Sequence, residues 1–140
     1  MKIYLNNKIN YIFIIVFFSI IDQLSKIYIN YNVHKLLNKD IVIFTIEFVR
    51  NYGAAFNILS GNRLFLTLIS IISTIILSYF IFISDNKVIN KYGLSFILAG
   101  SIGNGIDRIL NGFVIDFIKI KFIDFPVFNI ADIVINIGVL

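Results

Sequence analysis

The pattern of apolar and polar positions divides the chain into four apolar stretches separated by polar segments. The clearest stretch covers residues 64–83 and contains no charge between Arg63 and Asp85. Because a helix rises about 1.5 Å per residue, about 20 residues cross the roughly 30 Å hydrocarbon layer of a bilayer. This stretch therefore predicts a membrane-spanning helix.

The first apolar stretch is expected to form one helix over about 9–29. It is uncharged until its far end, where Asp22 and Lys26 follow. Lys2 and Lys8 ahead of an apolar run are also typical of a secretory signal. No cleavage motif of small residues follows the run, which favours an uncleaved span.

Two more spans are predicted in the second half of the chain. One covers 92–110 and is uncharged until Asp107 and Arg108 near its end. The other covers 125–140, is interrupted only by Asp132, and is short for a span. We therefore expect an all-α membrane protein with four transmembrane helices.

The long polar segment between the first two spans contains a predicted strand. Residues 41–49 are rich in β-branched and aromatic side chains, and Asn51 and Gly53 supply turn chemistry. Residues 113–122 have the same strand-like character. Four spans would place both segments on one side of the membrane, so we expect a small β-rich platform there.

The composition agrees with a membrane protein. The chain is 59% hydrophobic and 14% charged, with a mean hydropathy of +0.91. Soluble domains average about 45–50% apolar and about 25% charged residues. The net charge of +4 comes from scattered basic residues with no run of Lys or Arg, so we expect membrane lipids as partners and no nucleic acid.

The residue types present restrict the available chemistry. The chain has no Cys, which excludes disulfides and thiolate chemistry, and leaves the redox compartment open. His34 is the single His, so a His-based metal site or a Ser-His-Asp triad is not expected. The sequence therefore predicts no metal and no cofactor.

The basic residues leave the orientation in the membrane open. The loops on the side of the termini hold four Lys and Arg residues, and the loops on the opposite side hold seven. The raw count favours the long loop in the cytoplasm, whereas the density of basic residues and the flanks of the first helix favour the termini there. We expect both termini in the cytoplasm.

Asp116 and Asp132 lie 16 positions apart in very apolar sequence. An ionised Asp at the centre of a membrane helix costs about 2.5–3.5 kcal/mol on insertion scales, so such residues usually serve a function. Two carboxylates that meet in space can share one proton and activate a water molecule. We expect this pair to be the chemical centre.

Further polar residues fall near the same ends of the predicted spans. Structural interpretations remain open for several of them: Asp22 and Lys26 can pair along one helix face, and Asn129 can cap the last helix. Asp107 and Arg108 can simply end a helix. The full set of candidate supporting residues is Asp22, Lys26, Asn51, Gly53, Asn104, Asp107, Arg108 and Asn129.

Five ordered motifs resemble those of the lipoprotein signal peptidase (signal peptidase II) family. They are Asp22-Gln23-Leu24-Ser25-Lys26, Asn51-Tyr52-Gly53-Ala54-Ala55-Phe56, Gly103-Asn104-Gly105-Ile106-Asp107-Arg108, Gly112-Phe113-Val114-Ile115-Asp116-Phe117 and Phe128-Asn129-Ile130-Ala131-Asp132. Their order and the four-span layout both match. The chain departs from the family at Ala99-Gly100, where a Gly pair is common, and in the eight residues that follow Asp132, where relatives usually have a longer helix.

The resemblance implies that residues 1–140 form one integral membrane peptidase domain with Asp116 and Asp132 as catalytic aspartates. The other candidate residues would support the site or position substrate, and Arg108 or Lys26 would meet phosphate or carbonyl groups. The implied substrate is a diacylglyceryl-modified prolipoprotein cut before its lipidated Cys. The resemblance also implies the bacterial inner membrane, an active site near the extracytoplasmic face, and no cofactor; we expect a monomer.

A different class of function stays open at this point. Intramembrane Asp residues also mark transporters and proton relays, and Asp22, Asp107 and Asp132 could line a proton path. Against this, the chain has no inverted repeat and its polar groups gather at one face. A structural accessory subunit would leave the carboxylate pair unexplained.

Overall fold

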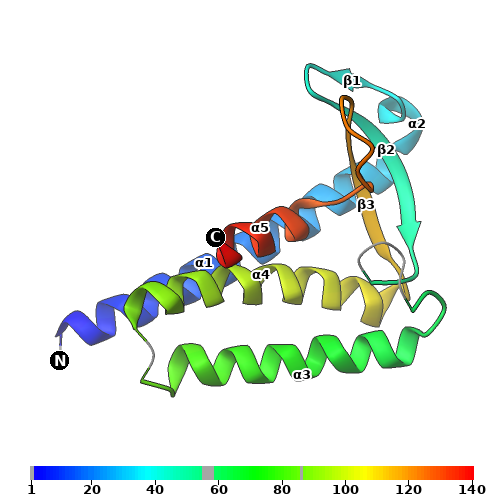
Figure 1. Ribbon diagram of the computed structural model, residues 1–140. Helices are drawn as coiled ribbons and strands as arrows, with labels where there is room; N and C mark the ends of the chain where they lie inside the picture. The colour runs from blue at the N-terminus through cyan, green and yellow to red at the C-terminus, as the bar shows by residue number, and fades with distance from the viewer. Residues whose placement is uncertain (1, 55–58, 86) are drawn as a thin grey trace.

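The computed structural model describes residues 2–54, 59–85 and 87–140 and is mostly helical, with a small antiparallel sheet at one end of the helices (Figure 1). The helices are α1 (Lys2–Tyr31), α2 (Val33–Leu36), α3 (Arg63–Phe82), α4 (Val88–Leu110) and α5 (Ile130–Val139). The strands are β1 (Asp40–Ile41), β2 (Phe44–Asn51) and β3 (Val114–Ile120).

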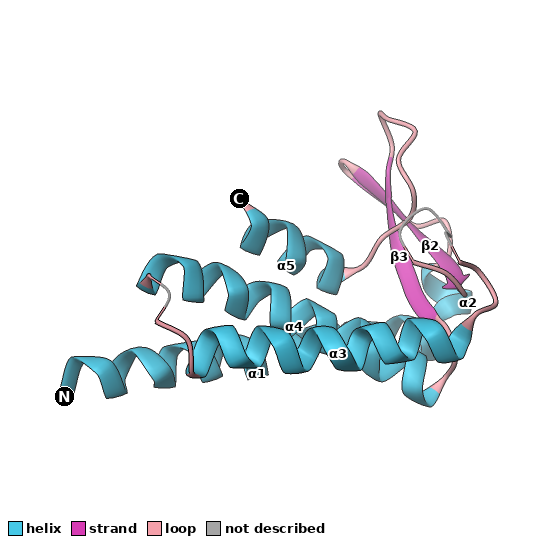
Figure 2. Cartoon of the chain, turned by 60° about the horizontal axis from the view of Figure 1, so that its bottom comes forward, coloured by secondary structure: helices cyan, strands magenta, loops and turns pink. Residues whose placement is uncertain are grey.

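The helix α4 lies between the other long helices and packs against α1, α3 and α5 (Figures 1 and 2). The predicted helix at 64–83 is confirmed within one residue at each end, since α3 covers Arg63–Phe82. The predicted helices at 9–29 and 92–110 are also present, and both begin earlier than expected, as α1 and α4.

The last helix is shorter than the predicted 125–140, because α5 begins only at Ile130. Pro126 lacks the backbone N–H that a helix interior needs. Phe128 is instead paired with Ile118 of β3, exchanging backbone hydrogen bonds of 3.1 and 2.8 Å. Strand pairing thus holds the chain extended up to the residue that caps α5.

The expected β-rich platform is confirmed as a three-stranded antiparallel sheet in the order β1-β2-β3. Its main ladder pairs Phe44 with Ile120 and Asn51 with Val114, and a bulge interrupts it between Ile46 and Val49. Gly112 (φ 80°) makes the turn from α4 into β3, a conformation that favours glycine. The platform therefore joins the C-terminal end of α4 directly.

Close backbone packing holds α4 against α1 and α5. A Cβ added at Gly100 would collide with the carbonyl oxygen of Ala131, so this glycine permits the α4–α5 contact. Ala99 is fully buried, and its carbonyl oxygen accepts a hydrogen bond of 3.0 Å from Ser19 of α1. The sequence departure at Ala99 thus lies where a methyl group fits, and the required glycine is retained.

Many large apolar side chains remain exposed, most densely along α3. Two helical segments of the described residues, Asn7–Tyr31 and Arg63–Phe82, are long and apolar enough to cross a membrane. α4 carries Lys91 near its start and Asp107 and Arg108 near its end, and α5 has ten residues, about 15 Å at the usual helical rise. The four-span layout therefore stays a prediction.

Candidate active site

The structure gathers the candidate residues at the end of the helices that carries the sheet. Asp116 lies on β3, Asn51 ends β2, and Asp132 is in the first turn of α5. α1, α4 and the loops beside the sheet contribute the others: Asp22, Lys26, Gly53, Asn104, Asp107, Arg108 and Asn129.

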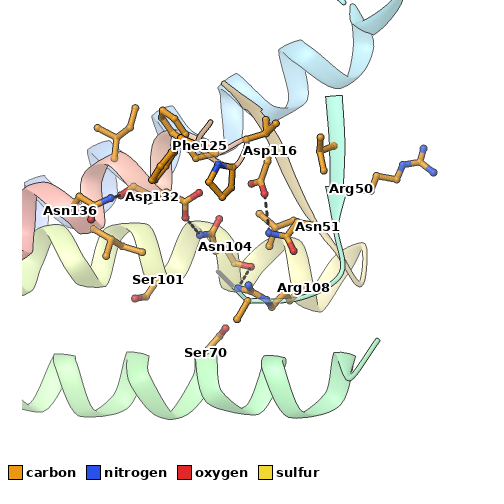
Figure 3. Close-up of a pocket in the computed structure, with 18 of the residues that line it drawn as sticks. Arg50, Asn51, Ser70, Ser101, Asn104, Arg108, Asp116, Phe125, Asp132 and Asn136 are labelled. Carbon is orange, nitrogen blue, oxygen red and sulfur yellow. Dashed lines mark hydrogen bonds between the residues drawn. The ribbon is translucent and has the colours of Figure 1, made fainter. Parts of the chain in front are cut away.

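A cavity of about 1020 Å³ opens between the sheet and the helices α3, α4 and α5. Both carboxylates lie above α4 in Figure 3, and Asn104 rises from that helix toward them. The polar residues lining the cavity are Arg50, Asn51, Ser70, Ser73, Ser101, Asn104, Arg108, Asp116, Asp132 and Asn136. The remaining wall is mostly apolar, as in sites that bind substrates with hydrophobic parts.

Asn129 connects the two aspartates. Its side-chain oxygen accepts a hydrogen bond of 3.0 Å from the backbone N–H of Asp132, whose carboxylate accepts one of 3.1 Å from the backbone N–H of Asn129. This reciprocal capping box begins α5 and confirms the expected cap. The Nδ2 of Asn129 donates to Oδ1 of Asp116 at 2.6 Å. One buried amide therefore contacts both candidate catalytic residues.

Asp116 is 3% exposed and receives a second amide hydrogen bond, from Nδ2 of Asn51 to Oδ2 at 2.9 Å. Burial raises the pKa of Asp116 to about 6, and the negative charge of Asp132 acts in the same direction. The hydrogen bonds from Asn51 and Asn129 oppose this rise, because they stabilise the ionised form. Asp116 therefore keeps its proton at a pH where an ordinary Asp has lost it.

Asn104 connects the carboxylate of Asp132 to the buried interior. Its Nδ2 donates to Oδ1 of Asp132 at 2.9 Å. Its Oδ1 accepts hydrogen bonds from Nζ of Lys26 at 2.9 Å and from Nδ2 of Asn129 at 3.1 Å. The two ends of this amide thus have different partners, a cation on one side and a carboxylate on the other.

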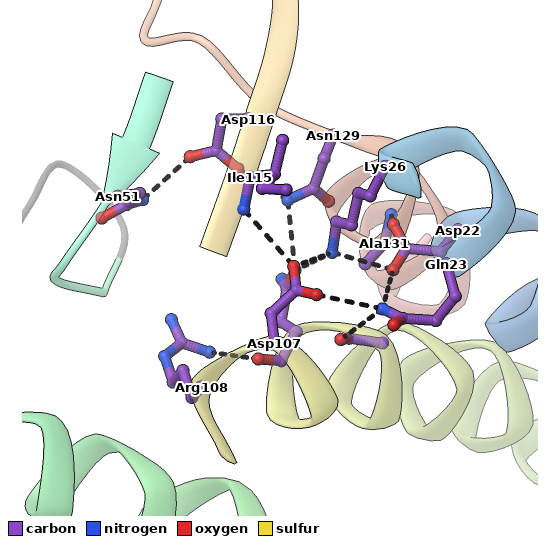
Figure 4. Close-up of polar contacts among 12 residues, drawn as sticks. Asp22, Gln23, Lys26, Asn51, Asp107, Arg108, Ile115, Asp116, Asn129 and Ala131 are labelled. Carbon is purple, nitrogen blue, oxygen red and sulfur yellow. Dashed lines mark hydrogen bonds and ion pairs between the residues drawn. The ribbon is translucent and has the colours of Figure 1, made fainter. Parts of the chain in front are cut away.

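A buried ion cluster joins α1 and α4 (Figure 4). The ammonium of Lys26 contacts Oδ2 of Asp22 at 2.8 Å and Oδ2 of Asp107 at 3.0 Å, and Lys26 is 1% exposed. The pairing of Asp22 with Lys26 expected from their spacing is therefore confirmed. Lys26 is enclosed, so of the two cations expected to meet phosphate or carbonyl groups, only Arg108 lines the cavity.

The two acidic members of the cluster also hold neighbouring elements in place. Oδ1 of Asp22 accepts a hydrogen bond of 2.9 Å from the backbone N–H of Ala131, and Oδ2 of Asp107 accepts one of 3.3 Å from Ile115. These bonds fasten α5 to α1 and β3 to α4, directly beside the two aspartates. Breaking one partner of a buried ion pair typically costs about 3–5 kcal/mol.

Arg108 links α4 to the turn that follows β2. Its Nη2 donates to the carbonyl oxygen of Gly53 at 3.0 Å, and the N–H of Gly53 donates to Oδ1 of Asn51 at 2.9 Å. Arg50 points away from the cavity in Figure 3 and lies over the ring of Phe113, 5.2 Å from its centroid. Ala55 and Phe56 of the same motif lie outside the described residues.

Several cavity and cluster residues were not among the sequence-derived candidates. Gln23 donates to Asp107 and to the carbonyl oxygen of Gly103, although no separate role was predicted for it. Asn136 follows Asp132 by four residues, so helical spacing alone could have placed it on the same face. No sequence signal identified the serines, Ser70, Ser73 and Ser101.

The described residues contain no group of three or more His, Asp or Glu side chains arranged to hold a metal ion. Asp116 and Asp132 instead have amide and backbone N–H donors on their oxygens. Such donors suit carboxylates that exchange protons. The arrangement can hold two acids of unequal environment beside one cavity.

Comparison with known proteins identifies the family of this chain. Residues 14–140 match the family model for signal peptidase (SPase) II. The lipoprotein signal peptidase of Lactiplantibacillus plantarum is 36% identical over 132 residues, covering 93% of this chain and 89% of the relative. That of Caldicellulosiruptor bescii is 48% identical over 98 residues, covering 70% of this chain and 63% of the relative.

A solved structure described as a bacterial membrane enzyme has a TM-score of 0.83 and 41% sequence identity, covering 93% of this chain and 82% of that one. A second, also a bacterial membrane enzyme, has a TM-score of 0.82 and 40% identity. The fold and the matches together define a membrane protease. The chain belongs to the signal peptidase II family.

Proposed function

We propose that this chain is an aspartic endopeptidase of the membrane that removes signal peptides from bacterial prolipoproteins, with Asp116 and Asp132 as its acid–base pair. The observation that carries this proposal is the joining of two carboxylates by Asn129 at one cavity. The names of the relatives support the substrate class.

The two carboxylates have the environments that an acid and a base require. Asp116 is buried with a raised pKa and serves as the acid, whereas Asp132 is partly exposed to the cavity and serves as the base. Asp132 takes a proton from water as the water oxygen attacks the scissile carbonyl carbon, and Asp116 gives its proton to the carbonyl oxygen.

The tetrahedral intermediate then collapses in the reverse sense. Asp132 passes its proton to the leaving amine as the C–N bond breaks, and a hydroxyl of the intermediate returns a proton to Asp116. Both residues finish in their starting protonation states. The resemblance to the family implies that the leaving amine belongs to the diacylglyceryl-modified Cys.

The cavity suits a substrate that carries lipid. It is mostly apolar, it extends along α3 and α5, and Arg108 provides a cationic group beside the carboxylates. We infer that acyl chains reach it laterally from the bilayer, while Arg108 meets carbonyl or phosphate oxygens. Asn51 and Asn104 are suitable contacts for the peptide backbone.

The proposal includes a membrane arrangement with four spans, α1, α3, α4 and α5, in one domain over residues 1–140. The N-terminus lies at the end away from the sheet, and α5 runs from the sheet toward that end (Figure 1), which supports the proposal that both termini are cytoplasmic. The sheet and the carboxylates then face the outside of the bacterial inner membrane. The chain acts as a monomer in this proposal.

The alternative of a proton-relay transporter is not favoured. Asp22 and Asp107 share Lys26 in a buried cluster and do not line the cavity. The described cluster and the two aspartates also lie at the same end of the helices. A proton path would need titratable groups distributed across the bilayer.

The test is cleavage of a diacylglyceryl-modified prolipoprotein peptide by purified protein in detergent. Asp116→Asn and Asp132→Asn should each abolish cleavage before the modified Cys, because each removes one protonation role. Asp85→Asn is the matched control, since Asp85 is an exposed carboxylate between α3 and α4. Substantial activity in either folded site variant would refute the acid–base pair.

A further inference from the structure

Lys26 is a buried cation that the proposed reaction does not use. Its three N–H donors have three partners: Asp22 at 2.8 Å, Asp107 at 3.0 Å and Oδ1 of Asn104 at 2.9 Å. An ammonium group can only donate hydrogen bonds. Whatever atom of Asn104 faces Lys26 must therefore be its oxygen.

This restriction fixes the other end of the same amide. With Oδ1 directed to Lys26, the NH₂ group of Asn104 is directed to Oδ1 of Asp132 at 2.9 Å. A reversed amide would set an NH₂ group against the ammonium and an oxygen against the carboxylate. Both contacts would then be repulsive inside the protein, where such contacts are costly.

The two other amides at the site are fixed in the same way by backbone groups. Oδ1 of Asn129 accepts from the backbone N–H of Asp132, and Oδ1 of Asn51 accepts from the backbone N–H of Gly53. Each NH₂ group is left to donate to Asp116, and that of Asn129 also donates to Oδ1 of Asn104 at 3.1 Å. Asn104 is the one amide of the three whose oxygen is held by a side-chain cation.

We propose that Lys26 is a positioning residue for the acid–base pair, which orients the amide of Asn104 so that it always donates to Asp132. The inference rests on the proposed function of Asp116 and Asp132. Lys26 would thus affect catalysis without touching substrate, because it is enclosed by the protein. The N–H donated by Asn104 then keeps an oxygen of the Asp132 carboxylate in a fixed hydrogen bond beside the cavity.

Other charges also act on the pair and must be separated from this effect. Asp22 and Lys26 face it from α1, and Asp107 and Arg108 from α4. The guanidinium of Arg50, on β2, points away. A test must therefore distinguish the orientation of Asn104 from the plain charge of Lys26.

The experiment measures kcat and KM against pH for Lys26→Met, Asn104→Leu and the double variant, on the lipidated peptide in detergent. Each single change should lower kcat at least tenfold and move the acidic limb of the kcat profile about one pH unit upward. For Lys26→Met, KM should stay within about twofold, because the enclosed Lys26 does not contact substrate. In the double variant the limb should move no further, because Lys26 acts through Asn104.

Lys91→Met is the matched control, since Lys91 is also buried but donates to the carbonyl oxygen of Ser84 near the other end of α4. It should leave the pH profile unchanged. Where Lys26→Met does not fold, Asn104→Asp provides the test. It retains an oxygen for Lys26 and sets a second oxygen against Asp132, so kcat should fall and the acidic limb should rise.

An unchanged pH profile in the folded variants would overturn the inference. An additive shift in the double variant would also overturn it, because Lys26 would then act through its charge alone and not through Asn104. Asp116→Asn and Asp132→Asn are assayed in parallel. If these remain active, the proposed function itself fails. If they are inactive while the profiles of the Lys26 and Asn104 variants match the unmodified protein, only the positioning role is refuted.

Discussion

Replacing Asp116 with Asn is expected to remove activity and to remove a pH-dependent loss of stability from the folded protein. Ionisation of the Asp116 carboxyl group is unfavourable in the folded protein, because burial raises its pKa from 3.8 to about 6. The neighbouring charge of Asp132 adds to the rise, and the amides of Asn51 and Asn129 offset only part of it. An Asn has a similar shape and no charge. Its NH₂ group would face one of the two amide donors, a cost that does not change with pH.

The size of the effect follows from proton linkage. In the unfolded chain the carboxyl titrates near 3.8, so between pH 3.8 and about 6 the folded protein binds more protons. The free energy of unfolding therefore falls as pH rises through this window. Each pKa unit is worth about 1.4 kcal/mol, so ionised Asp116 costs about 3 kcal/mol above pH 7. Well below pH 4 the cost disappears.

The assay compares the free energy of unfolding of the unmodified protein and Asp116→Asn in a mild detergent between pH 4.5 and 7.5. The free energy of unfolding of Asp116→Asn, relative to that of the unmodified protein, should rise by about 2 kcal/mol over this range. Asp85→Asn serves as the control, because Asp85 is exposed. A difference that stays constant with pH would refute the reasoning, since Asp116 would then titrate as an ordinary Asp.

Three further predictions concern stability, pH and metals. Asp22→Asn should destabilise the protein by about 3 kcal/mol, because it removes one charged partner from the buried Lys26 cluster. It should also lower kcat less than the changes at Asp116 or Asp132 do. Unfolding and cleavage assays measure the two effects, and unaltered stability would contradict the prediction. Cleavage should follow a bell-shaped pH profile whose limbs belong to the coupled pair, with the upper limb well above about 3.9; a single limb near that value would contradict the pairing. EDTA should leave activity unchanged, and a loss reversed by a divalent ion would mean that the two aspartates bind metal.

The sequence was sufficient to predict much of the fold because its hydrophobic periodicity is strong. The uncharged run at 64–83 became α3 almost residue for residue, and the β-branched run at 41–49 became most of β2. The beginning of α5 was predicted too early. Apolar composition continues through residues 125–128, whereas Pro126 and the pairing of Phe128 with Ile118 keep this segment out of the helix.

The candidate residues were found through ordered motifs, but their connections depend on tertiary contacts. The spacing of Asp22 and Lys26 predicted their pairing, since both lie on one helix face. Nothing in the sequence placed Asp107 on the same ammonium, because α1 and α4 meet only in the folded chain. The orientation of Asn104 likewise follows from partners on α1 and α5.

Polar residues beside the proposed acid–base pair and part of the cavity wall lie on different helices, α4 and α3. α4 carries Asn104, Asp107 and Arg108 and packs against three helices, whereas α3 packs mainly against α4. α3 contributes Ser70 and Ser73 to the cavity, with no carboxylate. Substitutions along α3 can therefore alter which signal peptides and acyl chains fit while the acid–base pair stays intact. Sequence drift across relatives should accumulate on α3, and a library restricted to it should yield altered substrate preference.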